Sequence, residues 1–208
     1  MKNSTVHLYV FDTMSDWEYG YVVAGVNTPE FQKTPGRFRV KTAGLAAQPV
    51  TTAGGLRVMP DLVLADLKAS ASSMLVLPGG AAWDQQKNKE AAQLAAEFLA
   101  NETSVAAICG ATAGLARAGL LDAVPHTSNS KAYIEATGYR GSAFFRQQPA
   151  VRSGNLITAS AMSPLEFARE IFSLLDVYSE ATLAAWYDLH HTQDARYFLE
   201  LMKAGGAT

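Results

Sequence analysis

The chain has one cysteine, Cys109, and its neighbours suit it to act as a nucleophile. It lies between an apolar run at residues 105–108, typical of a buried parallel strand, and a small-residue stretch at residues 111–118 with helical spacing. A strand that turns directly into a helix through Cys-Gly-Ala resembles a nucleophile elbow, which holds a side chain above the sheet edge. The free N–H groups and positive dipole of the helix start would favour the thiolate.

A lone cysteine also has a structural interpretation. Cysteine is among the most often buried residue types and behaves as a small hydrophobe, so this segment alone leaves both roles open. One cysteine cannot form an internal disulfide, and the amino terminus lacks a signal peptide's basic start and apolar stretch. We therefore expect a cytoplasmic protein.

Two acids, Asp16 and Glu18, follow the first apolar run, residues 6–11. They fall in the first turn of a predicted helix over residues 13–27, so their carboxylates could reach over the carboxyl ends of the strands, where open α/β sheets place their sites. The alternative is that acids at a helix N-terminus only complement the helix dipole.

The composition describes an ordinary globular protein. The 208 residues are 49% hydrophobic and 17% charged, with a net charge of −2. This length suits one α/β domain over residues 1–208. The chain lacks the basic excess of a nucleic-acid binder, and no segment approaches the ~18 consecutive apolar residues needed to span a bilayer. We expect neither a nucleic acid nor a membrane as partner.

The elements expected to position these groups alternate between strands and helices, which predicts a right-handed parallel sheet. We expect strands at 6–11, 38–42, 74–78, 105–108 and 126–129, hairpins at 49–59 and 151–159, a short helix or turn at 61–66, and helices at 13–27, 89–99, 111–118, 130–136, 165–175 and 181–202. Ser128 or Asn129 is the expected cap of the helix over 130–136. Gly114 inside a helix is costly unless something packs against it.

No cofactor or metal is expected. The Gly79-Gly80 turn fits neither the dinucleotide-binding nor the phosphate-loop pattern. His190 and His191 are adjacent, so on a helix they face different directions and make a poor metal pair.

Four segments in order resemble the DJ-1/ThiJ/PfpI superfamily, within the class I glutamine amidotransferase-like fold. These are Glu18 after the first strand, Pro78-Gly79-Gly80 after a middle strand, the elbow at 107–115, and residues 155–168. The resemblance runs from about residue 6 to 175. It implies a flavodoxin-like α/β three-layer sandwich, a parallel central sheet with helices on both faces. Residues 178–208 would add a C-terminal helix, and members commonly form homodimers.

The resemblance also implies site residues. Cys109 would be reactive, with its sulfur hydrogen-bonded by a protonated carboxyl at Glu18. The N–H groups of Gly80 and Gly110 would form an oxyanion hole. Asp16 is a second candidate acid or base, because isocyanide hydratases of this superfamily use an aspartate near this region.

One segment departs from the pattern. Many members place a histidine after two threonines downstream of the elbow, as the base of a Cys-His pair. Aligning Thr127-Ser128 with those threonines puts Asn129 in that place, and asparagine cannot accept a proton. His126 reaches Cys109 only if the alignment shifts by three residues, and a strand reverses its facing at odd shifts.

The resulting hypothesis is a small-molecule enzyme of the hydrolase, hydratase or glyoxalase-like kind, with Cys109 as nucleophile and Glu18 as proton relay. The alternative is a redox-sensing or stress-response protein that acts through reversible oxidation of Cys109.

Overall fold

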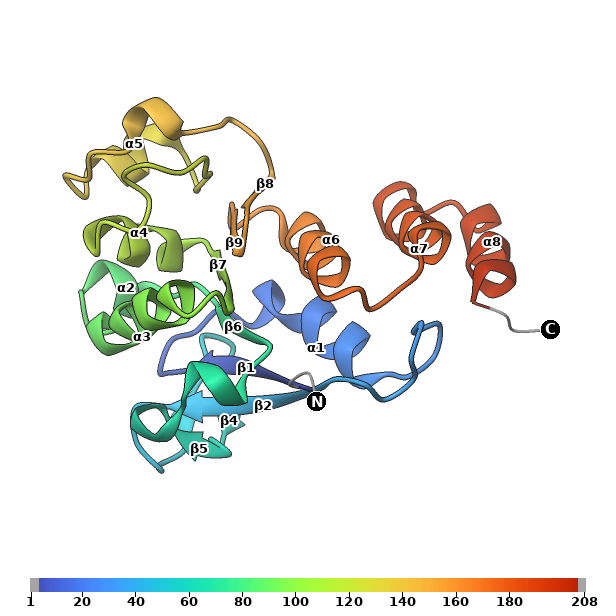
Figure 1. Cartoon of the computed structure of the whole chain (residues 1–208), viewed down its shortest axis with the longest axis horizontal. Coiled ribbons are helices and arrows are strands. Elements are labelled where there is room, and N and C mark those ends of the chain that lie inside the picture. The colour runs from blue at the N-terminus through green and yellow to red at the C-terminus, as the bar shows by residue number, and fades with distance from the viewer. Residues whose placement is uncertain (1–3, 206–208) are drawn as a thin grey trace.

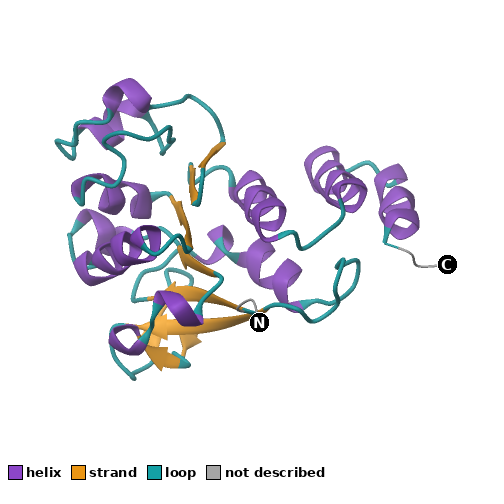
Figure 2. Ribbon diagram, in the orientation of Figure 1, coloured by secondary structure: helices purple, strands orange, loops and turns teal. Residues whose placement is uncertain are grey.

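A seven-stranded, mostly parallel sheet forms the centre of the computed structural model, which describes residues 4–205 (Figures 1 and 2). Its strand order is β5-β2-β1-β6-β7-β9-β8, and only β8 runs antiparallel to its neighbour. The strands are β1 (Thr5–Val10), β2 (Arg39–Gly44), β5 (Leu62–Val63), β6 (Met74–Leu77), β7 (Ser104–Ile108), β8 (Ala150–Ser153) and β9 (Leu156–Ala159). The separate hairpin of β3 (Val50–Thr51) and β4 (Arg57–Val58) lies outside this sheet.

Helices cover both faces of the sheet, which confirms the flavodoxin-like sandwich. The helices α1 (Gly20–Asn27) and α6 (Pro164–Leu175) pack together on one face. The helices α2 (Ala81–Asp84), α3 (Lys89–Ala100) and α4 (Gly110–Arg117) pack together on the other, with α5 (Lys131–Glu135) against α4. In Figure 1 these two groups lie on opposite sides of the strands.

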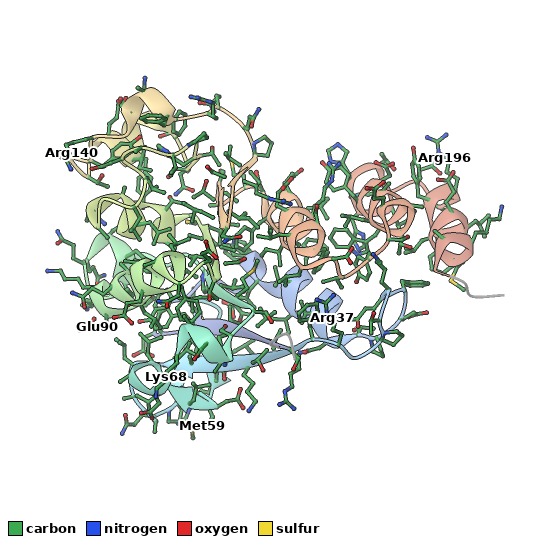
Figure 3. The ribbon with its side chains drawn as sticks, in the orientation of Figure 1. Arg37, Met59, Lys68, Glu90, Arg140 and Arg196 are labelled. Carbon is green, nitrogen blue, oxygen red and sulfur yellow. The ribbon has the colours of Figure 1, made fainter. Side chains whose placement is uncertain are left out.

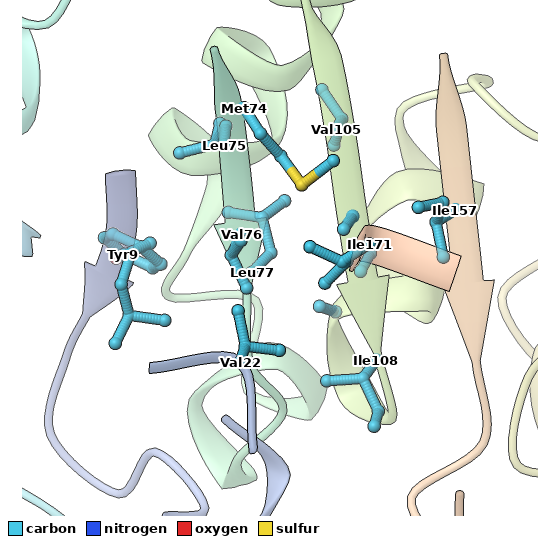
Figure 4. Close-up of a cluster of buried hydrophobic side chains, with 14 of the residues drawn as sticks. Tyr9, Val22, Met74, Leu75, Val76, Leu77, Val105, Ile108, Ile157 and Ile171 are labelled. Atoms are coloured by element: carbon cyan, nitrogen blue, oxygen red, sulfur yellow. The ribbon is translucent and has the colours of Figure 1, made fainter. Parts of the chain in front are cut away.

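The central strands are apolar throughout because both of their faces are covered. Every residue of β6 and β7 is buried, and Figure 4 shows their side chains meeting Val22 of α1 and Ile171 of α6. Charged side chains such as Lys68, Arg140 and Arg196 lie at the periphery (Figure 3). Within residues 4–205, none of the helices is long and apolar enough to cross a bilayer.

The predicted helix over 13–27 begins later than expected. Residues Asp16–Glu18 form a separate 3-10 helix, η1, and α1 starts only at Gly20. The segment 61–66 contains the short strand β5 before a 3-10 turn, and 126–129 makes only an isolated bridge between His126 and Phe145. The cap of α5 is Ser130, whose hydroxyl accepts from Tyr133 N–H, so the expectation of Ser128 or Asn129 was wrong.

The predicted terminal helix over 181–202 is two helices, α7 (Glu180–Thr192) and α8 (Arg196–Ala204). The chain breaks at Gln193, whose φ is 59°. The two helices pack against each other, and α7 also packs against α6. No glycine or proline lies between residues 181 and 202, so the sequence gives no sign of this break.

The indole of Trp83 explains why α4 carries a glycine in its interior. A Cβ on Gly114 would lie 2.2 Å from the indole Cε3 of Trp83, so the ring occupies the space that a side chain would need. Trp83 Nε1 donates to Pro78 O at 2.9 Å, which fixes the ring between α4 and the end of β6. The expectation that something must pack against Gly114 is confirmed.

Gly114→Ala should therefore lower the free energy of unfolding by about 1–3 kcal/mol, the usual cost of overpacking. Urea denaturation followed by circular dichroism measures this change. Gly20→Ala is the matched control: nothing lies within 4 Å of its added Cβ, and a helical Gly→Ala change there should stabilise by about 0.4–1 kcal/mol. Equal effects at the two sites would contradict the packing role of Trp83.

Candidate functional site

Three neighbouring strands, β1, β6 and β7, deliver the candidate site residues to one edge of the sheet. Glu18 follows β1, Gly79 and Gly80 follow β6, and Cys109 follows β7. The chain passes from β1 outward to β2 and β5, then returns to β6 on the other side of β1. This reversal of strand order is a topological switch point, where open α/β sheets bind their ligands beyond the carboxyl ends of the strands.

Cys109 is held in an unusual backbone conformation. Its φ is 58° and its ψ is −127°, a region that non-glycine residues rarely adopt and one that costs about 1–3 kcal/mol. Its N–H donates to Ala159 O at 3.0 Å, and its carbonyl accepts from the Thr112 hydroxyl at 2.6 Å. The neighbouring strand and α4 therefore hold the turn on both sides, as in a nucleophile elbow.

Glu18 is buried, with 1% of its surface exposed. Its Oε2 accepts from Gly79 N–H at 2.6 Å, and its carboxyl also hydrogen-bonds Ser15 and the Cys109 side chain. A Cβ on Gly79 would lie 2.4 Å from the Cβ of Cys109 and 2.7 Å from Glu18 Oε2. Only glycine at position 79 lets the carboxyl and the sulfur meet.

The electrostatics of the pair differ from the expected low-pKa thiol. Burial and then the negative charge of Glu18 raise the pKa of Cys109 to about 11, outweighing the donors from Asn129 and Gly110 that lower it. Burial also raises the pKa of Glu18, against the hydrogen bonds that lower it. A carboxyl with a raised pKa beside a thiol is suited to take the thiol proton as the sulfur attacks.

Gly80 and Gly110, the predicted oxyanion-hole residues, lie side by side. Gly80 O is 3.2 Å from the position of a Cβ on Gly110, and the Gly110 N–H makes a hydrogen bond to the sulfur. Gly80 precedes α2 and Gly110 begins α4, so both glycines lie at the start of a helix. Their action on an oxyanion stays a prediction.

Asn129, not His126, faces the sulfur. Asn129 Nδ2 donates to Cys109 Sγ at 3.5 Å, and its Oδ1 accepts from Ala161 N–H at 2.9 Å. His126 is fully buried elsewhere, with Nδ1 2.8 Å from Val124 O and Nε2 2.9 Å from the Tyr139 hydroxyl. The structure thus does not bring the candidate His126 to Cys109, because both ring nitrogens have other partners.

Asp16 lies one turn from Glu18 but contacts the β3–β4 hairpin. Its Oδ2 accepts from Gly54 N–H at 2.7 Å, while its buried Oδ1 has no hydrogen-bond partner among residues 4–205. The structure therefore does not bring Asp16 into hydrogen-bond contact with Cys109.

Sequence reasoning missed several residues around the pair. Ser15 hydrogen-bonds the Glu18 carboxyl, and no sequence motif indicates this role. The Tyr133 hydroxyl donates to Asp84 Oδ1 at 2.7 Å, and the charge of Cys109 contributes to raising the Tyr133 pKa, so this pair lies near the sulfur. No local motif joins residues 49 positions apart, so only the fold reveals the pair.

Comparison with known proteins finds the same organisation elsewhere. The family model described as "DJ-1/PfpI family" matches residues 4–174. The "Uncharacterized protease YoaZ" of Bacillus subtilis is 42% identical over 205 residues, which cover 97% of this chain and 98% of that protein. The "Uncharacterized protease YdeA" of the same organism is 30% identical over 169 residues, covering 80% and 81% of the two chains.

Solved structures of related proteins have the same fold as this chain. A thiJ/pfpI family protein from Bacillus anthracis superposes with a TM-score of 0.93 at 40% identity and 98% coverage of both chains. The DJ-1 superfamily protein Atu0886 from Agrobacterium tumefaciens gives 0.81 at 29% identity, covering 91% of this chain and 98% of that one.

The Glu18 charge acts on the thiol in a way that alkylation can measure. Glu18→Gln removes the negative charge, keeps an acceptor for Gly79 N–H and adds an amide donor. The apparent pKa of Cys109 should therefore fall from about 11 by at least about one unit. The measurement is the rate of iodoacetamide alkylation against pH, which reports Cys109 alone because the chain has one cysteine. Glu166→Gln, on α6, is the control and should leave the profile unchanged. An unaltered profile in Glu18→Gln would show that this carboxyl does not act on the sulfur.

Proposed function

The chain belongs to the DJ-1/PfpI family, and we propose that it is a cysteine-dependent enzyme acting on small reactive carbonyl compounds of the α-oxoaldehyde class. Cys109 is the nucleophile, and Glu18 moves the protons. The observation that carries the proposal is the contact of the sulfur with a buried carboxyl and an amide, in place of an imidazole.

The histidines support this choice of chemistry. The chain has four, and each has another partner: His7 bonds Ser72, His126 bonds Tyr139, and the other two, on α7, bond Trp186 O and Tyr187. A carboxyl is then the proton-transfer group at the sulfur. Hydrolysis of a peptide bond requires a group that protonates the departing amine. Addition of the thiol to an aldehyde has no leaving group, so it does not need that proton donor. The protease names of the two relatives are therefore a weaker guide to substrate than the site itself.

The proposed reaction conserves atoms and electrons. As Sγ of Cys109 bonds the aldehyde carbon, Glu18 takes the thiol proton and the carbonyl electron pair moves to oxygen, beside the N–H groups of Gly80 and Gly110. Glu18 returns the proton to that oxygen, giving a hemithioacetal. It then removes the C–H proton from the former aldehyde carbon, and the electron pair moves through the new C=C bond to the ketone oxygen, which gives an enediolate.

Glu18 returns this proton to the neighbouring carbon, and the hydroxyl proton on the former aldehyde carbon passes to the adjacent oxygen. The product is a thioester of a 2-hydroxy acid, which water hydrolyses to the free acid and the thiol. The aldehyde carbon is oxidised and the ketone carbon is reduced, so no external oxidant enters. Because its pKa is raised, the Glu18 carboxylate is a stronger base than an ordinary carboxylate, and the same group can return the proton as an acid.

The same electrostatics weigh against a redox sensor. Peroxide oxidises the thiolate rather than the thiol. A cysteine whose pKa is raised to about 11 forms little thiolate without a base acting on it at the moment of reaction. The arrangement therefore favours attack on a bound substrate, during which Glu18 can remove the thiol proton, over spontaneous oxidation of the free thiol.

Methylglyoxal is the probe that tests the proposal, with the 2-hydroxy acid product measured by chromatography. Cys109→Ser should abolish turnover. Glu18→Gln should lower kcat by about 10²–10⁴-fold even though its thiol alkylates faster. His126→Gln is the control for a buried polar change away from the sulfur and should retain kcat in the folded fraction.

Mass spectrometry of the wild type must show Cys109 reduced during the assay. Absence of turnover with a reduced thiol would overturn the proposed substrate class. Parallel assays with a peptide, a primary amide and an isocyanide then separate the other reactions of the family. Turnover of methylglyoxal that survives Cys109→Ser would overturn the role of the sulfur.

A further inference from the structure

A cavity of about 380 Å³ lies between α2, α3 and α4, on a different side of Trp83 from the sulfur. The Trp83 side chain, Gly114 and the alanines of α3 and α4 give it an apolar wall. Its volume falls in the range of small-molecule sites. The Cβ and the Cδ1 edge of Trp83 lie against Gly110, and its Cε3–Cζ3 edge lies on Gly114, so this one side chain stands between the cavity and the Cys109 turn.

The charged groups that line the cavity are all cationic. Lys89 at the start of α3 and Arg117 at the end of α4 belong to its lining, which contains no acid. Among residues 4–205, neither cation has a carboxylate within 4.0 Å. Arg117 Nη1 donates to Trp83 O at 3.1 Å, which holds the guanidinium next to the apolar wall. Its remaining N–H groups are the donors that a ligand would use.

A buried amide also belongs to this wall. Asn88 is only 2% exposed, and its Oδ1 accepts from the Tyr9 hydroxyl at 3.0 Å. Its Nδ2 has no hydrogen-bond partner in the described part of the chain. A buried N–H donor without a partner carries an unrecovered desolvation cost, which a hydrogen bond to a ligand oxygen would recover.

We propose that this cavity binds a small organic carboxylate with an apolar body. The guanidinium of Arg117 offers a planar fork that matches the two oxygens of a carboxylate. Lys89 adds a second positive charge, and the Asn88 amide adds a donor at the inner wall. The Trp83 ring and the alanines take the apolar part. Inorganic phosphate would satisfy the cations but leave the apolar wall uncovered, so the carboxylate is the better match.

The site is independent of the proposed enzymatic reaction, because none of its lining residues belongs to the Cys109–Glu18 pair. Binding can therefore be tested without an activity assay. It can also be tested in a protein whose nucleophile has been removed.

The experiment is isothermal titration of Cys109→Ser protein at low ionic strength with phenylacetate and with its neutral isostere, phenylacetamide. We expect one-to-one binding of phenylacetate with a Kd of about 1 mM or tighter, and at least tenfold weaker binding of the amide. Arg117→Gln should weaken phenylacetate binding at least tenfold. Arg152→Gln, an exposed arginine on β8, is the matched control and should leave it unchanged.

Two further variants locate the ligand. Ala96→Phe fills the cavity and should abolish binding, while circular dichroism checks that the variant folds. Amide chemical shifts should move around α3 and α4 and stay constant at Asn129. Equal binding of acid and amide, an unchanged Kd in Arg117→Gln, competition by inorganic phosphate at equal concentration, or no heat up to about 10 mM ligand would each overturn the proposal.

Discussion

The meeting of a thiol and a carboxyl across one glycine is the constraint on which the site depends. The Gly79 backbone lies against both Cys109 and Glu18, and its N–H donates to the carboxyl. The ends of three strands must therefore stop at one level of the sheet. The late start of α1 follows from the same requirement. Residues 16–18 form a tight 3-10 turn in which Glu18 is buried, and α1 begins only at Gly20.

Trp83 connects the end of β6 to the helices α2 and α4, which cover one face of the sheet. It follows Gly80 on α2, donates through its indole to Pro78 O, and fills the space above Gly114. One side chain thus fixes the distance between the end of β6 and α4, the two segments that supply the predicted oxyanion donors. Because the ring also lines the cavity between the helices, the same packing defines both the elbow and the separate hollow beside it.

Much of this arrangement could be predicted from the sequence because it depends on local patterns. Apolar runs predict the buried strands, and glycines between β-prone segments predict the two hairpins. A Ser-Pro pair before a stretch of helical periodicity predicts α6. The place of Asn129 followed from the family resemblance, by aligning Thr127-Ser128 with the two threonines of the family pattern. The break at Gln193 did not, because no glycine or proline marks it. The thiol pKa was wrongly expected to be low because it depends on burial and on Glu18, 91 positions earlier in the chain. The homodimer stays a prediction.

The two margins of the sheet have a consequence for how copies of this chain meet. One margin is β5, which is two residues long, and the other is β8, which is four residues long and runs against its neighbour. Exposed strand edges offer unpaired backbone groups to other chains and invite aggregation, and very short edges limit that risk. Such short edge strands offer few unpaired backbone groups to a second sheet, so strand-to-strand pairing between copies of this chain is disfavoured.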